Sequence, residues 1–536
     1  MCKIRMKDCR IQKGIDINMK DRLLNCIKEN KFFAVIWLLF SGYYLYRLFA
    51  IVPWYDEIYT YLNFIDKGVF YSATHWPLPN NHVFFSMISA FFRIFGIYIG
   101  LRGVSYLSAL GTLLLFYGIL KNLFSKPLAL CGVMVYGMLL ATNALAVQGR
   151  GYSLTTFFLA LSLYCGWQIC CKEDKKRYYI GFALSLYLGL YTLMSSLYWV
   201  LSVCVCLGVL LLLYNKYKRL LYLVLSAMAA AVLTLFSYAI LWLHMGAWQL
   251  MGENAALSGS AWHVIMEYPR TCLMKGIGIM TADSNLQSID RNAFVRDFRY
   301  FFRDTLGSFL GYRHNSMLIV FTVILAVVLF AGICRIVSCK RHSLLQEERG
   351  LLAYVLPGLG FPVIYFILLV QSVYPFTRVF SFAGIYLAVL ICLLLQLLYR
   401  VLQRLFRKIT IADKYKNLLP VPVLLLCLFC MTDAAHNEGY SVRDDAAYDA
   451  IRNIDWSGVE NYLAGDIYAK QQVEFFCVQG DGQELSSSLT EPEVVILYKT
   501  DTLGGWPYLV TDEQVQALRL EYWTLVYEND LYQVYR

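Results

Sequence analysis

The stretch KFFAVIWLLFSGYYLYRLFAIVPWYDEIY, residues 31–59, joins a long apolar run to two adjacent carboxylates. The apolar part, which begins near residue 32, can cross a bilayer core of about 30 Å, because such a crossing takes about 20 helical residues. Further apolar runs that we interpret as spans begin near residues 103, 127, 152, 179, 197, 219, 317, 351, 378 and 418. The pattern predicts an all-α polytopic membrane protein with about eleven transmembrane helices.

Composition supports this class. Of the 536 residues, 59% are hydrophobic and 16% are charged, whereas soluble domains carry about 25% charged residues. Aromatic residues, which are included in the hydrophobic share, make up 16% of the chain and are typical of membrane interfaces and apolar grooves. These values exclude an ordinary soluble enzyme and a disordered chain.

Basic residues indicate the orientation, because Lys and Arg in short loops stay on the cytoplasmic side. With a cytoplasmic basic N-terminus (residues 1–31), the inner segments hold 28 of the 47 Lys and Arg residues. This topology predicts a transmembrane domain over residues 32–432, with outer loops at 53–102 and 244–316. The net charge of +10 then needs no nucleic acid, since the basic loops face anionic membrane lipids.

The segment HVFFSMISAFFRIFGI, residues 82–97, is also apolar but short, and Arg93 lies in its middle. A crossing here would reverse every later loop, so we expect an interfacial helix at the outer membrane surface.

The tail has a different character. Residues 494–498 and 522–527 are typical of strands, and residues 531–535 complete a predicted hairpin with the second of them. Residues 442–454 resemble an amphipathic helix. We expect a small extracytoplasmic α/β domain over residues 433–536.

The first candidate site residues are Asp56 and Glu57, in the aromatic segment that ends at Tyr59. Adjacent carboxylates can supply a general base or bind a divalent ion. A solvated acidic cap on an interfacial helix is the alternative.

The same loop continues with His75-Trp76-Pro77-Leu78-Pro79-Asn80-Asn81-His82. Two prolines stiffen it, and the Asn and His side chains can bind sugar hydroxyls or a phosphate. Metal binding by His75 and His82 lacks further ligands at an informative spacing. Taken alone, such a segment is more often a turn that caps the interfacial helix.

Three arginines stand where predicted spans meet the outer surface: Arg102, Arg150 and Arg378. Guanidinium groups form paired hydrogen bonds with phosphate, so their convergence would make a lipid-phosphate pocket. Each alone could be a snorkelling residue. Further along, Arg296, Arg299 and Arg303 share a helical face that either contacts headgroups or pairs with the interspersed Asp residues.

Together these motifs resemble the GT-C membrane glycosyltransferases, in particular the group of protein O-mannosyltransferases and lipid A aminoarabinose transferases. The residues that carry the resemblance are the Asp56-Glu57 pair, the His75–His82 segment, Arg102 and the Arg150-Gly151-Tyr152 turn. It covers residues 30–180 well, and beyond them only Arg378 and the topology support it. Residues 244–316 are too few for the MIR domain of eukaryotic protein O-mannosyltransferases.

The resemblance implies an inverting sugar transfer from a polyprenyl-phosphate donor to an acceptor hydroxyl on the extracytoplasmic face. Asp56 would be the general base, which Glu57 assists or orients, and Arg150, Arg378 and then Arg102 would neutralise the leaving phosphate. The remaining substrate-binding residues would be Tyr59, His75, Asn80, Asn81, His82 and Tyr152. No nucleotide cofactor is expected, a divalent metal stays open, and the carrier would be undecaprenyl phosphate in a bacterial plasma membrane.

Two other functions are compatible with parts of this pattern. A transporter or flippase would also have many spans, but transport favours polar groups near the bilayer midplane and internal repeats. A non-catalytic protein that handles lipid-linked glycans would use the same arginines. The sequence leaves the sugar open, and the acceptor could be a glycan, a lipid or a protein.

Overall fold

All eleven predicted spans are helices in the computed structural model, which describes residues 29–75, 81–172, 174–254, 257, 259–282, 289–341, 349–405, 418–437 and 439–536. The predicted N-terminal segment therefore lies almost entirely outside the described residues. The eleven are α2 (Lys31–Ala50), α6 (Ile97–Leu123), α7 (Lys126–Met138), α9 (Tyr152–Cys171), α10 (Lys176–Thr192), α11 (Leu197–Leu213), α12 (Tyr217–Glu253), α16 (Met317–Arg341), α17 (Leu352–Gln371), α18 (Ala383–Leu405) and α20 (Pro420–Asn437).

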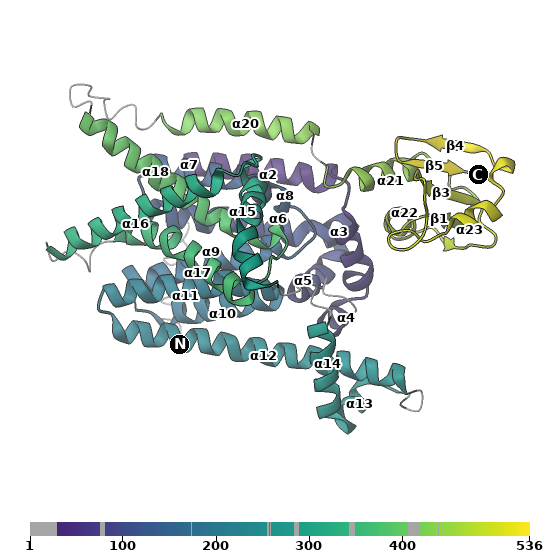
Figure 1. Ribbon diagram of the computed structural model, residues 1–536, viewed down its shortest axis with the longest axis horizontal. Coiled ribbons are helices and arrows are strands. Elements are labelled where there is room, and N and C mark those ends of the chain that lie inside the picture. The colour runs from purple at the N-terminus through teal and green to yellow at the C-terminus, as the bar shows by residue number, and fades with distance from the viewer. Residues whose placement is uncertain are drawn as a thin grey trace, which may run out of the picture.

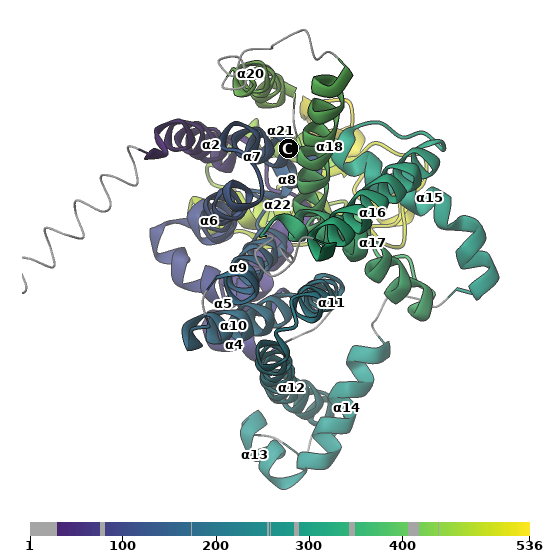
Figure 2. The same ribbon diagram turned by 90° about the vertical axis from the view of Figure 1, so that its left-hand side faces the viewer.

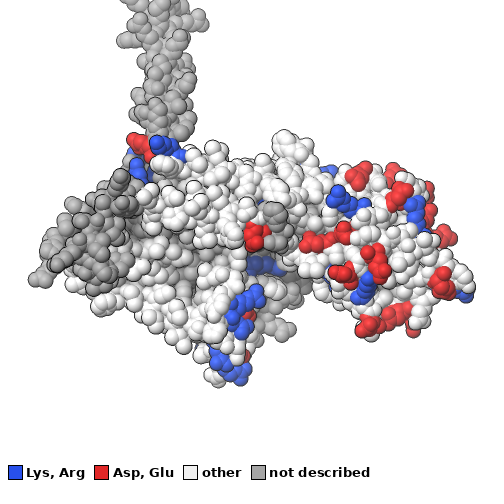
Figure 3. Space-filling view, turned by 90° about the horizontal axis from the view of Figure 1, so that it is seen from above, with Lys and Arg blue, Asp and Glu red and all other residues white. Residues whose placement is uncertain are grey.

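Within the described ranges, eight of these helices are long and apolar enough to cross a membrane, while α7, α10 and α20 are shorter. Large apolar side chains face outward from the bundle, among them Phe236 on α12, Phe330 on α16 and Phe429 on α20. On the face that Figure 3 shows, the bundle carries few charged side chains, whereas charged side chains are gathered on the C-terminal part. Such a surface suits lipid rather than water, and the chain is a multi-pass membrane protein.

Two predicted span boundaries are wrong. Helix α6 begins at Ile97 rather than near residue 103, so Arg102 lies inside the helix. Helix α18 begins at Ala383 rather than near 378, and Arg378 belongs to a separate 3₁₀ turn, η6 (Thr377–Phe380). In both places a charged residue, Arg102 or Arg378, lies near the start of the predicted span. Each charge is paired with a group elsewhere in the fold, so it does not mark where the helix begins.

The predicted loop 53–102 is mostly helical. It contains α3 (Tyr55–Thr60), the π-helical turn η1 (Tyr61–Ile65), α4 (Val69–Thr74) and α5 (Val83–Phe92), which ends in the 3₁₀ turn η2 (Arg93–Phe95). The short helix predicted over residues 82–97 is thus present, and its position at the membrane surface stays a prediction. The loop 244–316 likewise holds α13 (Ala261–Glu267), α14 (Pro269–Ala282) and α15 (Arg291–Leu310).

On α15 the arginines pair locally. Arg296 contacts Asp297 and Arg303 contacts Asp304, each with Nε 2.9 Å from a carboxylate oxygen. The self-paired alternative therefore holds for these two residues.

The C-terminal domain, here residues 439–536, contains one five-stranded sheet in the order β2-β1-β3-β5-β4. Its strands are β1 (Asn461–Ala464), β2 (Ser486–Ser487), β3 (Val494–Tyr498), β4 (Leu525–Glu528) and β5 (Tyr532–Tyr535). Strand β1 is parallel to β2 and β3, whereas β3–β5 and β5–β4 are antiparallel, with Tyr498 opposite Tyr532. The predicted strand, hairpin and first helix, α21 (Val442–Arg452), are confirmed.

This domain has its own apolar core, in which α21 and α22 (Ile467–Val473) cover the sheet. It lies at the end of the bundle that carries α3, beyond the ends of the long helices (Figures 1 and 2). The fold therefore brings α3 between the bundle and the C-terminal domain.

Candidate active site

Helix α3 sends its two carboxylates in different directions. Glu57 is completely buried and its Oε2 accepts a hydrogen bond of 2.9 Å from the backbone N–H of Trp54, which closes the first turn of the helix. Asp56 keeps 15% of its side chain exposed. Successive helical residues are about 100° apart around the axis, so the two carboxylates point to different neighbours.

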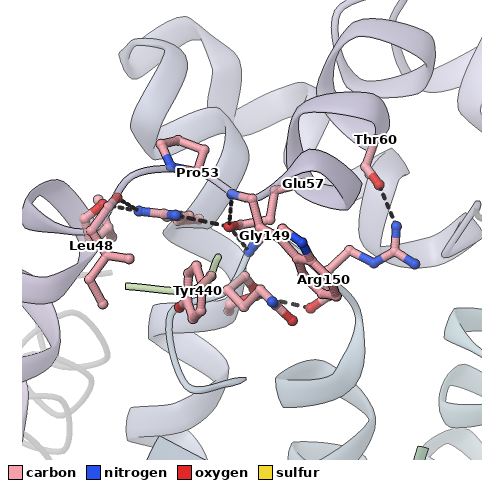
Figure 4. Close-up of polar contacts among 12 residues, drawn as sticks. Leu48, Pro53, Glu57, Thr60, Gly149, Arg150 and Tyr440 are labelled. Carbon is pink, nitrogen blue, oxygen red and sulfur yellow. Dashed lines mark hydrogen bonds and ion pairs between the residues drawn. The ribbon is translucent and has the colours of Figure 1, made fainter. Parts of the chain in front are cut away.

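Glu57 forms a two-bond ion pair with Arg102. The distances are 2.8 Å from Nε to Oε1 and 2.9 Å from Nη2 to Oε2, and neither side chain is exposed. Arg102 Nη1 also donates to the carbonyls of Leu48 and Ile51, and Gly149 N–H donates to Glu57 (Figure 4). The pair thus joins the end of α2, α3, α6 and the turn before α9, and both of its members are saturated by protein groups.

Asp56 is paired with Arg378. Nη2 of the arginine lies 3.1 Å from Oδ2 of the carboxylate, and 28% of the Arg378 side chain is exposed. The guanidinium also packs 5.1 Å from the Trp54 ring centroid and 4.8 Å from that of Phe376, and its buried Nε has no hydrogen-bond partner. A carboxylate and a cation are therefore held side by side with part of each accessible.

Arg150 reaches the same place from the turn before α9. Its Nη1 donates to Thr60 Oγ1 at 2.9 Å and to the carbonyl oxygen of Asp56 at 3.1 Å (Figure 4). The residue is 3% exposed, and its Nε has no hydrogen-bond partner. Among the described residues its guanidinium contacts Thr60, the Asp56 carbonyl and His82, and none of these groups is a carboxylate. A buried guanidinium of this kind is suited to an anionic ligand.

His82 completes this group. Its Nδ1 accepts a 2.7 Å hydrogen bond from the backbone N–H of Gly151, so the neutral ring carries its proton on Nε2. Burial, then the charges of Arg150 and Arg378, hold the pKa of His82 well below its usual value. Nε2 lies 3.2 Å from Nη2 of Arg150. Two donors thus lie side by side, and one anion oxygen that accepts a hydrogen bond from each of them would satisfy both.

Glycines allow the turn before α9 to approach its neighbours. A Cβ on Gly149 would lie 2.6 Å from Leu101 Cδ1 and 2.9 Å from the Leu101 carbonyl oxygen. A Cβ on Gly151 would lie 2.7 Å from Thr192 Cγ2 and 3.0 Å from His82 Nδ1. The Gly-Arg-Gly order therefore sets Arg150 and the hydrogen bond to His82 in place.

The other predicted site residues have different positions. Asn81 is buried and bonded to Ser72, His75 and Ser86, so it holds the turn before α5, while Asn80 lies outside the described residues. The ring of Tyr152 is 5.1 Å from that of His82. Tyr59 is half-buried beside Tyr55, and burial raises its pKa.

His75 is separate from the group around Asp56. It stacks on Tyr71 at 3.6 Å and lines a cavity of about 260 Å³ with Trp248 and Gln249. Among the described residues no three His, Cys, Asp or Glu side chains are grouped so that they could hold a metal ion.

A larger cavity of about 510 Å³ lies between α15, α16, α17 and α18. Its wall is almost entirely apolar, and it includes Phe380 of η6, the same short turn that carries Arg378. Aromatic side chains dominate it: Phe298, Phe301, Phe302, Phe309, Phe321, Phe361 and Phe380. One turn of chain therefore connects an apolar cavity with the charged group.

The sequence placed the C-terminal tail and the long loop on the acceptor side but identified no residue of the C-terminal domain as part of the site. Tyr440 donates to the carbonyl of Ala144 at 2.8 Å and lies under Arg102, 5.6 Å from ring centroid to Cζ (Figure 4). Gln472 donates to the carbonyl of Pro53 at 3.1 Å, and Tyr468 contacts Tyr55. No local pattern marks these residues, because their role depends on how two distant parts of the chain pack.

The helical bundle, the buried Glu57–Arg102 pair and the polar group at one bundle end define a polytopic membrane protein with the GT-C fold. The structure is similar to that of ArnT from Cupriavidus metallidurans bound to undecaprenyl phosphate, with a TM-score of 0.51, 10% sequence identity, and 95% of this chain and 98% of that chain covered. The archaeal oligosaccharyltransferase AglB from Archaeoglobus fulgidus matches with a TM-score of 0.39 at 11% identity, over 84% of this chain and 64% of that one. No protein-family model and no curated protein matches the sequence.

Proposed function

We propose that the protein is an integral membrane glycosyltransferase that moves a monosaccharide from a polyprenyl-phosphate donor to an acceptor hydroxyl. The observation that carries the proposal is the convergence of Asp56, His82, Arg150 and Arg378, which come from four separate segments. A general base beside several cationic or N–H donors is what transfer from a phosphate leaving group requires.

In the proposed step, Asp56 accepts the proton of the acceptor hydroxyl as that oxygen forms a bond to the anomeric carbon. The bond between the anomeric carbon and the phosphate oxygen breaks on the opposite side, so the configuration inverts. The phosphate keeps the electron pair, and Arg378, Arg150 and the Nε2 proton of His82 stabilise its charge.

The apolar cavity supports the same assignment. It has room for part of an isoprenoid chain, and Phe380 in its wall is two residues from Arg378. A lipid whose tail fills this cavity would have its phosphate near the arginines. The ArnT structure to which this fold is similar contains undecaprenyl phosphate, so we propose that carrier, with the site on the extracytoplasmic face of the plasma membrane.

Glu57 and Arg102 are assigned a positioning role in this proposal. Both are fully buried and saturated by protein groups. They set the direction of α3, and therefore the place of Asp56, without touching substrate.

The decisive experiment is Asp56→Asn in the full chain, reconstituted in nanodiscs with undecaprenyl-phosphate sugars and a cell-envelope acceptor fraction. We expect turnover to fall by about 10²–10⁴-fold, the usual contribution of a general base, while undecaprenyl phosphate still binds. Asp66→Asn is the matched control, since Asp66 is an acid of the same predicted loop paired with an arginine, Arg93. A transporter or a handling protein would be nearly indifferent to Asp56→Asn, and that result would reject the proposal.

A further inference from the structure

The C-terminal domain is docked against the segment that carries Asp56. Gln472 is buried and donates to the carbonyl of Pro53, three residues before Asp56. Phe475 packs edge-on against Tyr61 and Tyr98, with ring centroids 5.2 and 6.2 Å apart. Because these contacts are buried, the domain is held in a fixed position beside the site.

This docking places Tyr468 against Tyr55, the residue before Asp56. Its ring centroid is 5.1 Å from that of Tyr55, at an interplanar angle of 44°, and both rings are half-buried. The charge of Asp56 acts on both tyrosines. Two aromatic rings from different domains therefore stand beside the proposed base.

Tyr468 is backed by a rigid set of contacts. The Arg443 guanidinium carbon lies 4.6 Å from its ring centroid and 3.9 Å from that of Tyr498. Asp466, which is fully buried, binds Arg443 at 2.8 Å and caps α22 through the N–H of Ala469. The ring is thus held in one orientation before any ligand arrives, which lowers the entropy cost of binding.

The two tyrosine side chains carry no charge themselves. Asp466 compensates the charge of Arg443. Burial, then the nearby Tyr59 and Asp56, raise the pKa of Tyr55 to about 12, and burial raises the pKa of Tyr468. Both hydroxyls are therefore protonated at neutral pH. Aromatic faces with hydroxyl groups suit the C–H face and hydroxyls of an uncharged sugar ring better than a charged peptide or phosphate.

We propose that Tyr55 and Tyr468 form an aromatic platform for a neutral saccharide ring of the acceptor, so that the acceptor is a glycan. This inference rests on the proposed function, since it assigns the acceptor side of the same site. It makes Tyr468 a substrate-contacting residue supplied by the C-terminal domain.

The test measures binding rather than transfer. Full-length Asp56→Asn protein in nanodiscs is titrated with maltose, cellobiose and N,N′-diacetylchitobiose, and binding is followed by saturation-transfer NMR. We expect at least one disaccharide to bind. Tyr468→Ala should weaken its affinity by about 2- to 10-fold, the range for one aromatic contact. Tyr468→Phe keeps the ring, so its affinity should stay within about twofold of that of the Asp56→Asn protein. Tyr522→Ala is the control, because Tyr522 is 80% exposed in the same domain.

The proposed glycan platform is overturned if none of the three disaccharides binds. It is also overturned if the protein with Tyr468→Ala added binds them as tightly as the Asp56→Asn protein does, while the two proteins have the same unfolding temperature. Binding of a serine-rich peptide in their place, lost in Tyr468→Ala, would also overturn it and assign a protein acceptor. Because Asp56→Asn is present throughout, these outcomes are independent of whether Asp56 is the general base.

Discussion

The carboxylate of Asp56 and the guanidinium of Arg378 form an ion pair, with Oδ2 3.1 Å from Nη2. One residue comes from α3 near the start of the chain and the other from the turn before α18, so only the folded bundle brings them together. The pair orients the carboxylate, and it leaves the Arg378 Nε without a hydrogen-bond partner. Because 28% of the Arg378 side chain is exposed, Arg378 can hold Asp56 and still donate to a phosphate oxygen.

Replacement of Arg378 tests this double role. We expect Arg378→Gln to lower turnover by about 10²–10³-fold, the usual cost of one donor that stabilises developing negative charge. Arg378→Lys should recover part of the rate, because an ammonium keeps the charge but cannot form paired bonds. Initial rates at saturating donor and acceptor measure the effect. Arg296→Gln, an exposed arginine paired with Asp297, should leave turnover unchanged, and equal rates for Arg378→Gln and Arg296→Gln would contradict the assignment.

Arg150 should act mainly on binding of the lipid phosphate. Its Nη1 donates to Thr60 and the Asp56 carbonyl. Among the described residues, Nε has no hydrogen-bond partner and Nη2 contacts the protonated Nε2 of His82. We expect Arg150→Lys to weaken the binding of undecaprenyl phosphate by about tenfold or more, because lysine lacks the planar guanidinium that forms paired hydrogen bonds with phosphate. Equilibrium binding of the labelled lipid in nanodiscs measures this. Arg93→Lys, at an arginine paired with Asp66, is the control, and unchanged affinity in Arg150→Lys would place the phosphate elsewhere.

Much of the fold was predictable because it follows from local patterns. Apolar runs located all eleven helices, and the β-branched and aromatic residues of Val494–Tyr498 and the turn near Asn529 located β3 and the hairpin. Strands β1 and β2 were missed because they are short and parallel, so no turn joins them directly to a partner.

The site was predictable only in its residue types. Arg102, Arg150 and Arg378 were expected to converge on a phosphate, but Arg102 is saturated by Glu57 and two carbonyls. Nothing in the spacing of these arginines distinguishes a buried structural cation from a ligand-binding one. That difference depends on which carboxylate lies opposite, and opposition between α3 and α6 is a tertiary property.

The Glu57–Arg102 pair yields a stability prediction. Removal of one partner leaves an uncompensated buried charge, which costs about 3–5 kcal/mol. We therefore expect Glu57→Gln and Arg102→Gln each to lower the unfolding temperature in detergent, and the double variant to lose less than the sum of the two, because the residues are coupled. Additive losses would show that the pair is not an energetic unit. Loss of turnover in Glu57→Gln without loss of stability would instead make Glu57 a direct participant in the chemistry.

The apolar cavity predicts selectivity for the length of the lipid. Thr305 of α15 lies in its wall, so Thr305→Phe should fill part of the space that an isoprenoid tail needs. We expect the KM for an undecaprenyl-phosphate sugar to rise by about one order of magnitude. The KM for a donor with two isoprene units should stay unchanged, because only the longer chain loses buried apolar area. Thr432→Phe on the exposed face of α20 is the matched control. An equal change for both donors would mean that the cavity does not hold the tail.

Asp444 gives the docked domain a pH-dependent stability. It is 1% exposed, its Oδ2 has no hydrogen-bond partner, and burial raises its pKa from 3.8 to about 7. Between about pH 4 and pH 7 the unfolded chain releases this proton while the folded chain keeps it, so the free energy of unfolding falls as pH rises through this window. Each unit of pKa difference corresponds to about 1.4 kcal/mol. Asp444→Asn keeps the oxygen that accepts from Gln472 and should remove this fall, which unfolding temperatures measured from pH 4 to pH 8 would reveal. Parallel pH profiles for Asp444→Asn and the unaltered protein would show that the Asp444 carboxyl is ionised in the folded state. Asp445 is the half-buried neighbour of Asp444 on α21, and Asp445→Asn separates the contribution of Asp445 from that of Asp444.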